Sequence, residues 1–428
     1  MVPYIRRALL SGLCLTHAAS AQNYTERYRP QYHFTPATNW MNDPNVPNGT
    51  GFAKRANPVI LSPPDEYADQ ILEFRDPNVF WHDVSQQWVS VISLAKLHKL
   101  LFYTSANLKD WEQVGEFGPA NAVGGVWECP SIFPLPLDGD GDLKWVAQIG
   151  LNPGGPPGTT GSGTQYIVGD FDGATFTPDA ESVEQTNWMD WGPDFYAAIS
   201  FSGLPLEDRV NVGWMSNWQY AAAIPTDPWR SAFSIPRNLS LHTINGKATL
   251  VQQPIVEVGD QETTSEHWDS LAAGTTKLNF TGKTLDITLT FAESDSTQFG
   301  IIVRATPDLS VQTQVGYNFA SQQLFVNRTK SGESGFEGSF ADVYYAPLPP
   351  QDGNVTLRLL VDWSSVEVFG GAGDVTLTAQ IFPSDDAVDA YLFSTDGSTS
   401  NVDISAMNVP SIGPGASQTS PPDSRRRR

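Results

Sequence analysis

The chain contains little cysteine and little positive charge. Only two cysteines, Cys14 and Cys129, occur among 428 residues, which excludes a framework of several disulfides. Lys and Arg number 25 against 47 Asp and Glu, so the formal net charge is −22. Such an acidic chain does not suit the phosphate backbone of a nucleic acid or an anionic membrane surface. We therefore expect no nucleic acid and no membrane among its partners.

The sequence also lacks an apolar run of 18 residues or more, which a membrane-spanning helix would need. Residues 1–21 combine Arg6 and Arg7, a short apolar run and an Ala-Ser-Ala site at Ala21, an order typical of a secretory signal peptide. Six Asn-X-Ser/Thr sequons lie at Asn23, Asn48, Asn238, Asn279, Asn327 and Asn354. Together these features predict a secreted glycoprotein, extracellular or in the cell wall.

Long helical periodicity is missing as well, and short β-branched and aromatic runs punctuated by Gly, Pro, Asp and Asn indicate an all-β protein. We interpret residues 22–256, which hold most of the 13 Trp, as a β-propeller. A polar linker is expected at 257–270. The cleaner alternation of residues 271–410 predicts a β-sandwich, and residues 411–428 are expected to form a disordered tail.

Acidic residues next to proline recur along the first region, in Asp43-Pro44, Asp76-Pro77 and Glu128-Cys-Pro130. One explanation is structural, because Asp-Pro is a common turn dipeptide. The alternative is that they occupy equivalent positions on successive propeller blades and point at a shared funnel. Several carboxylates in a Trp-rich protein suit glycoside hydrolysis, which needs one ionised carboxylate and one protonated acid. The six His show no metal-ligand spacing, so we expect no metal and no cofactor.

Three motifs carry a family resemblance: WMNDPN at residues 40–45, FRDP at 74–77 and WECP at 127–130. They resemble the signature blocks of glycoside hydrolase family 32, the family of invertases and inulinases, and the likeness is strongest to secreted fungal exo-inulinases. DWSSVEVF at 362–369 is similar to a motif of the family's second domain. The resemblance implies an all-β fold, with a five-bladed β-propeller followed by a β-sandwich.

The resemblance also implies a site. Its catalytic residues would be Asp43 as nucleophile, Glu128 as acid/base and Asp76 as transition-state stabiliser, and its substrate-binding residues would be Asn42, Arg75 and Trp229. In a retaining enzyme the nucleophile and the acid lie about 5–5.5 Å apart. The implied activity is release of terminal β-D-fructose from inulin, other fructans and sucrose. Within the family an invertase or a fructosyltransferase is the alternative, and outside it an inactive truncated relative or a carbohydrate-binding protein.

The chain departs from the family pattern directly after Asn45, where the rest of the first blade would follow. On the order of 90 residues, at about 45 per blade, have no counterpart between Asn45 and the Arg75-Asp76 motif. This gap would remove most of the first blade and much of the second. We therefore expect this chain to fold poorly or to have little activity.

Overall fold

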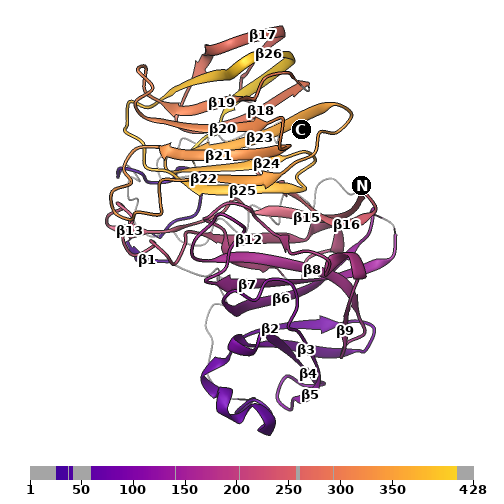
Figure 1. The fold of residues 1–428 in the computed structure, drawn as a ribbon. Helices are drawn as coiled ribbons and strands as arrows, with labels where there is room; N and C mark the ends of the chain where they lie inside the picture. The colour runs from indigo at the N-terminus through magenta and orange to yellow at the C-terminus, as the bar shows by residue number, and fades with distance from the viewer. Residues whose placement is uncertain are drawn as a thin grey trace, which may run out of the picture.

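The computed structural model describes residues 26–36, 38–41, 59–139, 141–201, 203–256, 261–292 and 294–411. The expected signal peptide, Asn42, Asp43 and all but the first residue of the expected tail lie outside these ranges. Strands dominate the described part, and its helices are short 3-10 turns. Figure 1 shows two stacked regions, with the strands up to β16 below those that follow.

Three antiparallel sheets form the first region. Their orders are β2-β3-β4-β5, then β10-β8-β7-β6 with β9 beside β8, then β11-β12-β15-β16 with β14 beside β12. The short β1 pairs in parallel with β13. The bounds are β1 (Asn39–Trp40), η1 (Asp65–Glu73), β2 (Phe74–His82), β3 (Gln87–Leu94), η2 (Ala95–Leu97), β4 (Lys99–Ser105), β5 (Glu112–Phe117), β6 (Val126–Pro136), β7 (Leu143–Asn152), β8 (Gly163–Phe171), β9 (Phe176–Pro178), η3 (Ala180–Ser182), β10 (Asn187–Trp188), β11 (Tyr196–Ser200), η4 (Leu206–Asp208), β12 (Val210–Met215), β13 (Trp229–Arg230), β14 (Ala232–Phe233), β15 (Arg237–Ile244) and β16 (Lys247–Pro254).

Apolar side chains between neighbouring sheets hold these blades together. One core joins the first two sheets through residues such as Phe102 and Trp127. A second core joins the next two through residues such as Val146 and Leu239. Burial of about 25 cal/mol per Å² of apolar surface favours this face-to-face packing. Three sheets of four or five strands are built in the part of the chain that the structure describes, fewer than the five blades that the family resemblance implies.

The second region is a β-sandwich made from one continuous ten-stranded sheet. The first half of the long β26 pairs with β19 and its second half with β18, so the strand passes from one layer to the other. The layers enclose an apolar core that includes Ile287, Ile301 and Leu377. The bounds are β17 (Thr263–Thr281), β18 (Leu285–Ala292), β19 (Gln298–Ala305), β20 (Gln312–Asn318), β21 (Gln323–Lys330), β22 (Val343–Pro347), β23 (Asn354–Asp362), β24 (Ser365–Gly370), β25 (Val375–Gln380) and β26 (Asp389–Asn408).

The start of β17 differs from the sequence-based boundary. Residues 263–270 were expected in the linker, but they pair with residues 400–407 of β26. Their side chains are only exposed or half-buried, and β17 pairs with β26 alone. Because this part of the strand buries so little, its sequence is polar and resembles that of a linker.

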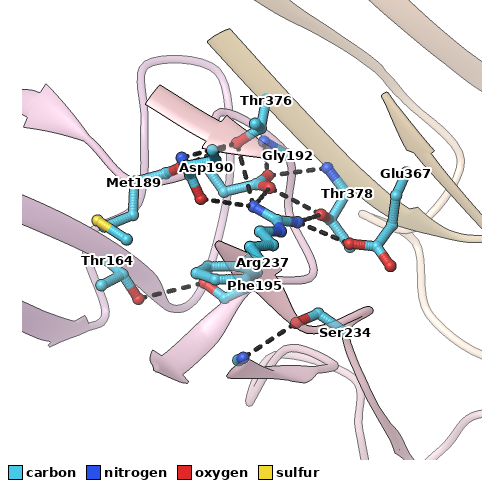
Figure 2. Close-up of polar contacts among 12 residues, drawn as sticks. Thr164, Met189, Asp190, Gly192, Phe195, Ser234, Arg237, Glu367, Thr376 and Thr378 are labelled. Carbon is cyan, nitrogen blue, oxygen red and sulfur yellow. Dashed lines mark hydrogen bonds and ion pairs between the residues drawn. The ribbon is translucent and has the colours of Figure 1, made fainter. Parts of the chain in front are cut away.

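Buried charges join the third blade to the sandwich, as Figure 2 shows. The Arg237 guanidinium on β15 lies 3.0 Å from Asp190 and 2.7 Å from Glu367 of β24, and all three side chains are fully buried. Asp190 also accepts hydrogen bonds from the backbone N–H and hydroxyl of Thr378. A buried ion pair is stable only when such additional hydrogen bonds accompany it, and this network supplies them from both regions.

The segment before β1 is anchored to the same network. Both ring nitrogens of the buried His33 face carboxylates, with Nδ1 2.8 Å from Asp362 and Nε2 2.8 Å from Glu367. The backbone N–H of Gln31 also donates to Asp362. The chain therefore reaches Trp40 and Met41 from a point fixed on the sandwich.

The protonation of His33 predicts a dependence of stability on pH. Burial alone would lower the pKa of His33, but the hydrogen bonds and charges of Asp362 and Glu367 raise it to about 9. Because this lies above the unfolded value of about 6.5, the stabilisation is complete below pH 6.5 and is lost as the pH rises through 9. We expect the free energy of unfolding to fall by on the order of 3 kcal/mol over this range.

Urea unfolding at pH 6.5, 8 and 9.5 measures this loss. A His33→Gln variant, which carries no titrating group at this position, should show a much flatter profile over the same range. Equal pH profiles for the two proteins would contradict the assignment.

Candidate active site

The first strand of each blade carries the same irregularity. Asp76 in β2, Cys129 in β6 and Ala197 in β11 all have positive φ, at 59°, 47° and 46°. Each lies where the pairing register with the next strand shifts, as in a β-bulge. Non-glycine residues rarely adopt this conformation, and it often marks a functional site. In each of three consecutive blades, the bulge changes the direction in which the neighbouring side chain points.

The repeated bulge shows that the equivalence predicted from the sequence is wrong by one residue. The acid-proline pattern suggested that Asp76 and Glu128 are equivalent. In the structure Asp76 corresponds to Cys129, and Arg75 corresponds to Glu128 and to Tyr196. The reason is that the bulge, and not the proline, sets the position.

The three residues before the bulges meet one another. The Arg75 guanidinium lies 3.0 Å from the Glu128 carboxylate, and the Tyr196 hydroxyl donates a hydrogen bond to the other Glu128 oxygen. These side chains come from three different blades, so they converge on the axis that the blades share. With both oxygens held, the Glu128 carboxylate has a fixed orientation.

Asp76 lies beside this group. Its carboxylate accepts a hydrogen bond of 3.1 Å from the backbone N–H of Cys129 and lies 3.8 Å from Arg75 Nε. The side chains of Arg75, Asp76 and Glu128 remain 32%, 30% and 20% exposed. The structure therefore brings three of the six expected site residues together where a ligand can reach them.

The described segment that precedes the expected nucleophile, Asp43, ends at Met41, beside the same group of side chains. The backbone carbonyl of Met41 accepts a hydrogen bond of 3.1 Å from the Trp214 indole, and the Trp214 ring packs edge-on against Tyr196. Asn42 and Asp43 themselves lie outside the described residues, and their roles stay predictions.

Trp229 differs from its expected role. Its side chain is fully buried, in a cluster with Tyr28, Phe340 and Phe382 at the boundary with the sandwich. The Arg29 guanidinium lies 4.8 Å from the centre of its ring. A side chain without exposed surface does not contact a substrate, so the structure gives Trp229 a packing role beneath β1.

Sequence reasoning missed Tyr196 and Trp214 as site residues. Both lie in stretches, DWGPDFY at 190–196 and GWM at 213–215, that resemble the family. Neither carries a charge that would mark it as catalytic. The positive φ of Ala197 is the feature that identifies Tyr196 as the equivalent of Glu128.

No group of three or more His, Cys, Asp or Glu in the described ranges could hold a metal ion. Among the helices of these ranges, none is long and apolar enough to cross a membrane.

Known protein families and solved structures are similar to this chain in both regions. Residues 46–254 match the Glycosyl hydrolases family 32 N-terminal domain, and residues 256–408 match the family's C-terminal domain. An extracellular exo-inulinase of Aspergillus niger is 56% identical over 368 residues, which cover 83% of this chain and 68% of that protein. The crystal structure of an exo-inulinase from Aspergillus awamori superposes with a TM-score of 0.87 at 43% identity, covering 91% of this chain and all of that one. A β-fructofuranosidase from Schwanniomyces occidentalis, complexed with fructosyl-erythritol, superposes with a TM-score of 0.72 at 29% identity, over 83% and 72% of the two chains.

The alignment with a bacterial relative is longer than the part of this chain that it includes. The alignment with a levanase of Bacillus subtilis is 35% identical over 496 positions and includes 91% of this chain. That share of 428 residues is about 390, so about 100 positions of the alignment hold no residue of this chain. The matches to both domains and the identity to these relatives show that the chain belongs to glycosyl hydrolase family 32.

Proposed function

We propose that this protein is a retaining glycoside hydrolase that releases terminal β-D-fructose from inulin, other fructans and sucrose. The observation that carries the proposal is the convergence of Arg75, Asp76 and Glu128 at the shared axis, beside the segment that leads to Asp43. The names of its relatives, exo-inulinase and β-fructofuranosidase, support the choice of substrate.

The reaction takes two steps. Asp43 attacks the anomeric carbon of the terminal fructose, the bond to the leaving oxygen breaks, and Glu128 gives its proton to that oxygen. A covalent fructosyl-enzyme results. Glu128, now ionised, takes a proton from water, and the hydroxide oxygen displaces Asp43 from the sugar. Two inversions at the same carbon leave fructose with its original configuration.

The neighbouring side chains orient this chemistry. Tyr196 and Arg75 hold the two oxygens of Glu128, which keeps the acid aimed at the leaving oxygen. Asp76, itself held by the Cys129 N–H, is placed to accept hydrogen bonds from fructose hydroxyls as positive charge develops on the ring. Charge-assisted hydrogen bonds of this kind are roughly twice as strong as neutral ones.

Secretion and glycosylation form part of the proposal, supported by the relatives named as extracellular. Of the sequons in the described residues, Asn279 and Asn354 are exposed, whereas Asn238 and Asn327 are half-buried. We therefore place glycans first at Asn279 and Asn354.

Product analysis by ion-exchange chromatography tests the proposal. Inulin should yield free fructose from the first time point, without early release of di-, tri- or tetrasaccharides, and sucrose should yield fructose and glucose in equal amounts. Because we expect part of the propeller to be missing from this chain, we expect the rate to lie below that of a five-bladed relative measured alongside. Oligosaccharide products from sucrose would indicate a fructosyltransferase, and the absence of any product would contradict the proposal.

A further inference from the structure

A further carboxylate, that of Glu73, contacts the guanidinium of Arg75. Glu73 is the last residue of η1 and directly precedes β2. Its carboxylate lies 3.3 Å from Arg75 Nη1, whereas the Glu128 carboxylate lies 3.0 Å from Arg75 Nη2. One guanidinium is therefore shared between two carboxylates, and one of these belongs to the expected acid.

The local backbone explains why Glu73 meets Arg75. Phe74, which separates the two residues, has an extended conformation, with φ −90° and ψ 96°. Alternate residues of an extended chain point to the same face, so the side chains of Glu73 and Arg75 lie next to each other. Phe74 points to the other face, where its ring packs beside Tyr103, and this packing holds the backbone in place.

A lysine holds the second oxygen of Glu73. Lys96 on η2 lies 2.7 Å from this oxygen, and only 15% of the Glu73 side chain is exposed. The hydrogen bond from Lys96 and the charge of Arg75 outweigh this partial burial and hold the pKa of Glu73 below its ordinary value. Glu73 therefore carries its negative charge throughout the neutral pH range, in a fixed orientation.

The sharing of Arg75 bears on a requirement of the proposed reaction. Glu128 must hold a proton when it meets the leaving oxygen, but Arg75 and the Tyr196 hydroxyl both contact its carboxylate and favour the ionised form. Glu73 counteracts Arg75, because it takes up part of the guanidinium's hydrogen-bonding capacity and because its own negative charge disfavours a second one nearby. Asp76 lies farther from this guanidinium, at 3.8 Å.

We propose that Glu73 is a positioning residue, which acts through Arg75 and keeps Glu128 protonated to a higher pH than Arg75 alone would allow. This role rests on the proposed function, because it requires Glu128 to be the acid. Glu73 does not touch the substrate. It sets how much of the Arg75 charge acts on Glu128.

The pH dependence of kcat/KM for sucrose tests the proposal, because it reports the groups that titrate in the free enzyme. At high pH the activity falls as Glu128 loses its proton. Glu73→Gln keeps the size of the side chain and removes its charge. In this variant the fall should move to lower pH by about one pH unit, so that above its midpoint the rate is about tenfold below that of the parent chain. A general loss of structure would instead lower the activity at every pH alike.

Two further variants make the result specific. Glu66→Gln is the matched control, because it removes the same charge from an exposed position on η1, and it should leave the alkaline limb of the profile unchanged. Lys96→Met removes the cation that competes with Arg75 for Glu73, and it should move the alkaline limb to higher pH.

The outcomes separate this role from the proposed function. Sucrose hydrolysis with an alkaline limb that Glu73→Gln leaves unchanged, or that Glu66→Gln shifts equally, would overturn the role of Glu73 and leave the proposed function intact. A shift to lower pH in Lys96→Met would also contradict that role. Absence of hydrolysis by the parent chain would contradict both.

Discussion

Replacing Glu128 with Gln should lower kcat on inulin and sucrose by about 10²–10⁴-fold, the usual contribution of a general acid. Gln keeps the size of the side chain and can still accept the Tyr196 hydrogen bond. It has no acidic proton for the leaving oxygen and no base for the attacking water, so both steps are slowed. Initial rates of fructose release measure the effect.

The leaving group supplies an internal control for this variant. An aryl fructoside with an acidic phenol leaves without protonation, so its first step should lose much less rate than that of sucrose. Glu112→Gln, an exposed acid on β5, should change neither rate. A loss of less than about threefold on sucrose in the Glu128→Gln protein would contradict its assignment as the acid.

Replacing Arg237 with Met should lower the free energy of unfolding by about 3–5 kcal/mol. The substitution leaves two buried carboxylates, Asp190 and Glu367, without the cation that both contact. Figure 2 shows that this guanidinium lies between the third blade and the sandwich, so the loss should loosen the contact between them. Urea denaturation at pH 6.5 measures the change.

Arg358→Met is the matched control. Arg358 forms an ion pair of the same length, 2.7 Å, with Asp286, but its side chain is 32% exposed. Asp286 is only 6% exposed, so this variant leaves one buried carboxylate without its cation, whereas Arg237→Met leaves two, and it should lose less stability. Equal losses in the two variants would show that the buried network does not stabilise the joint.

The fold class, and the fact that Asp76 and Glu128 lie at one place, could be predicted from the sequence for definite reasons. Alternating apolar residues in runs such as Thr284–Thr290 report which face of a strand is buried, and the structure has β18 at Leu285–Ala292. The motifs around Asp76 and Glu128 carry the family resemblance, and the structure brings their side chains to one place through Arg75. Asn42 and Asp43 remain predictions.

The remaining features depend on contacts between distant residues. Trp229 looked like a substrate-binding residue because its motif matches the family, but only the packed structure shows that Arg29 and Phe382 surround it. Arg75 and Glu128 occupy equivalent positions because each comes directly before a backbone bulge. The residue types alone do not reveal where such a bulge lies.

The central claim is that Asp43 and Glu128 act as a retaining pair in a double displacement. The anomeric form of the fructose first released, followed by NMR before it equilibrates in solution, tests this claim most directly. Our account predicts that β-fructose appears first, because two inversions restore the original configuration. Initial release of α-fructose would mean a single inversion by water, and it would contradict the account.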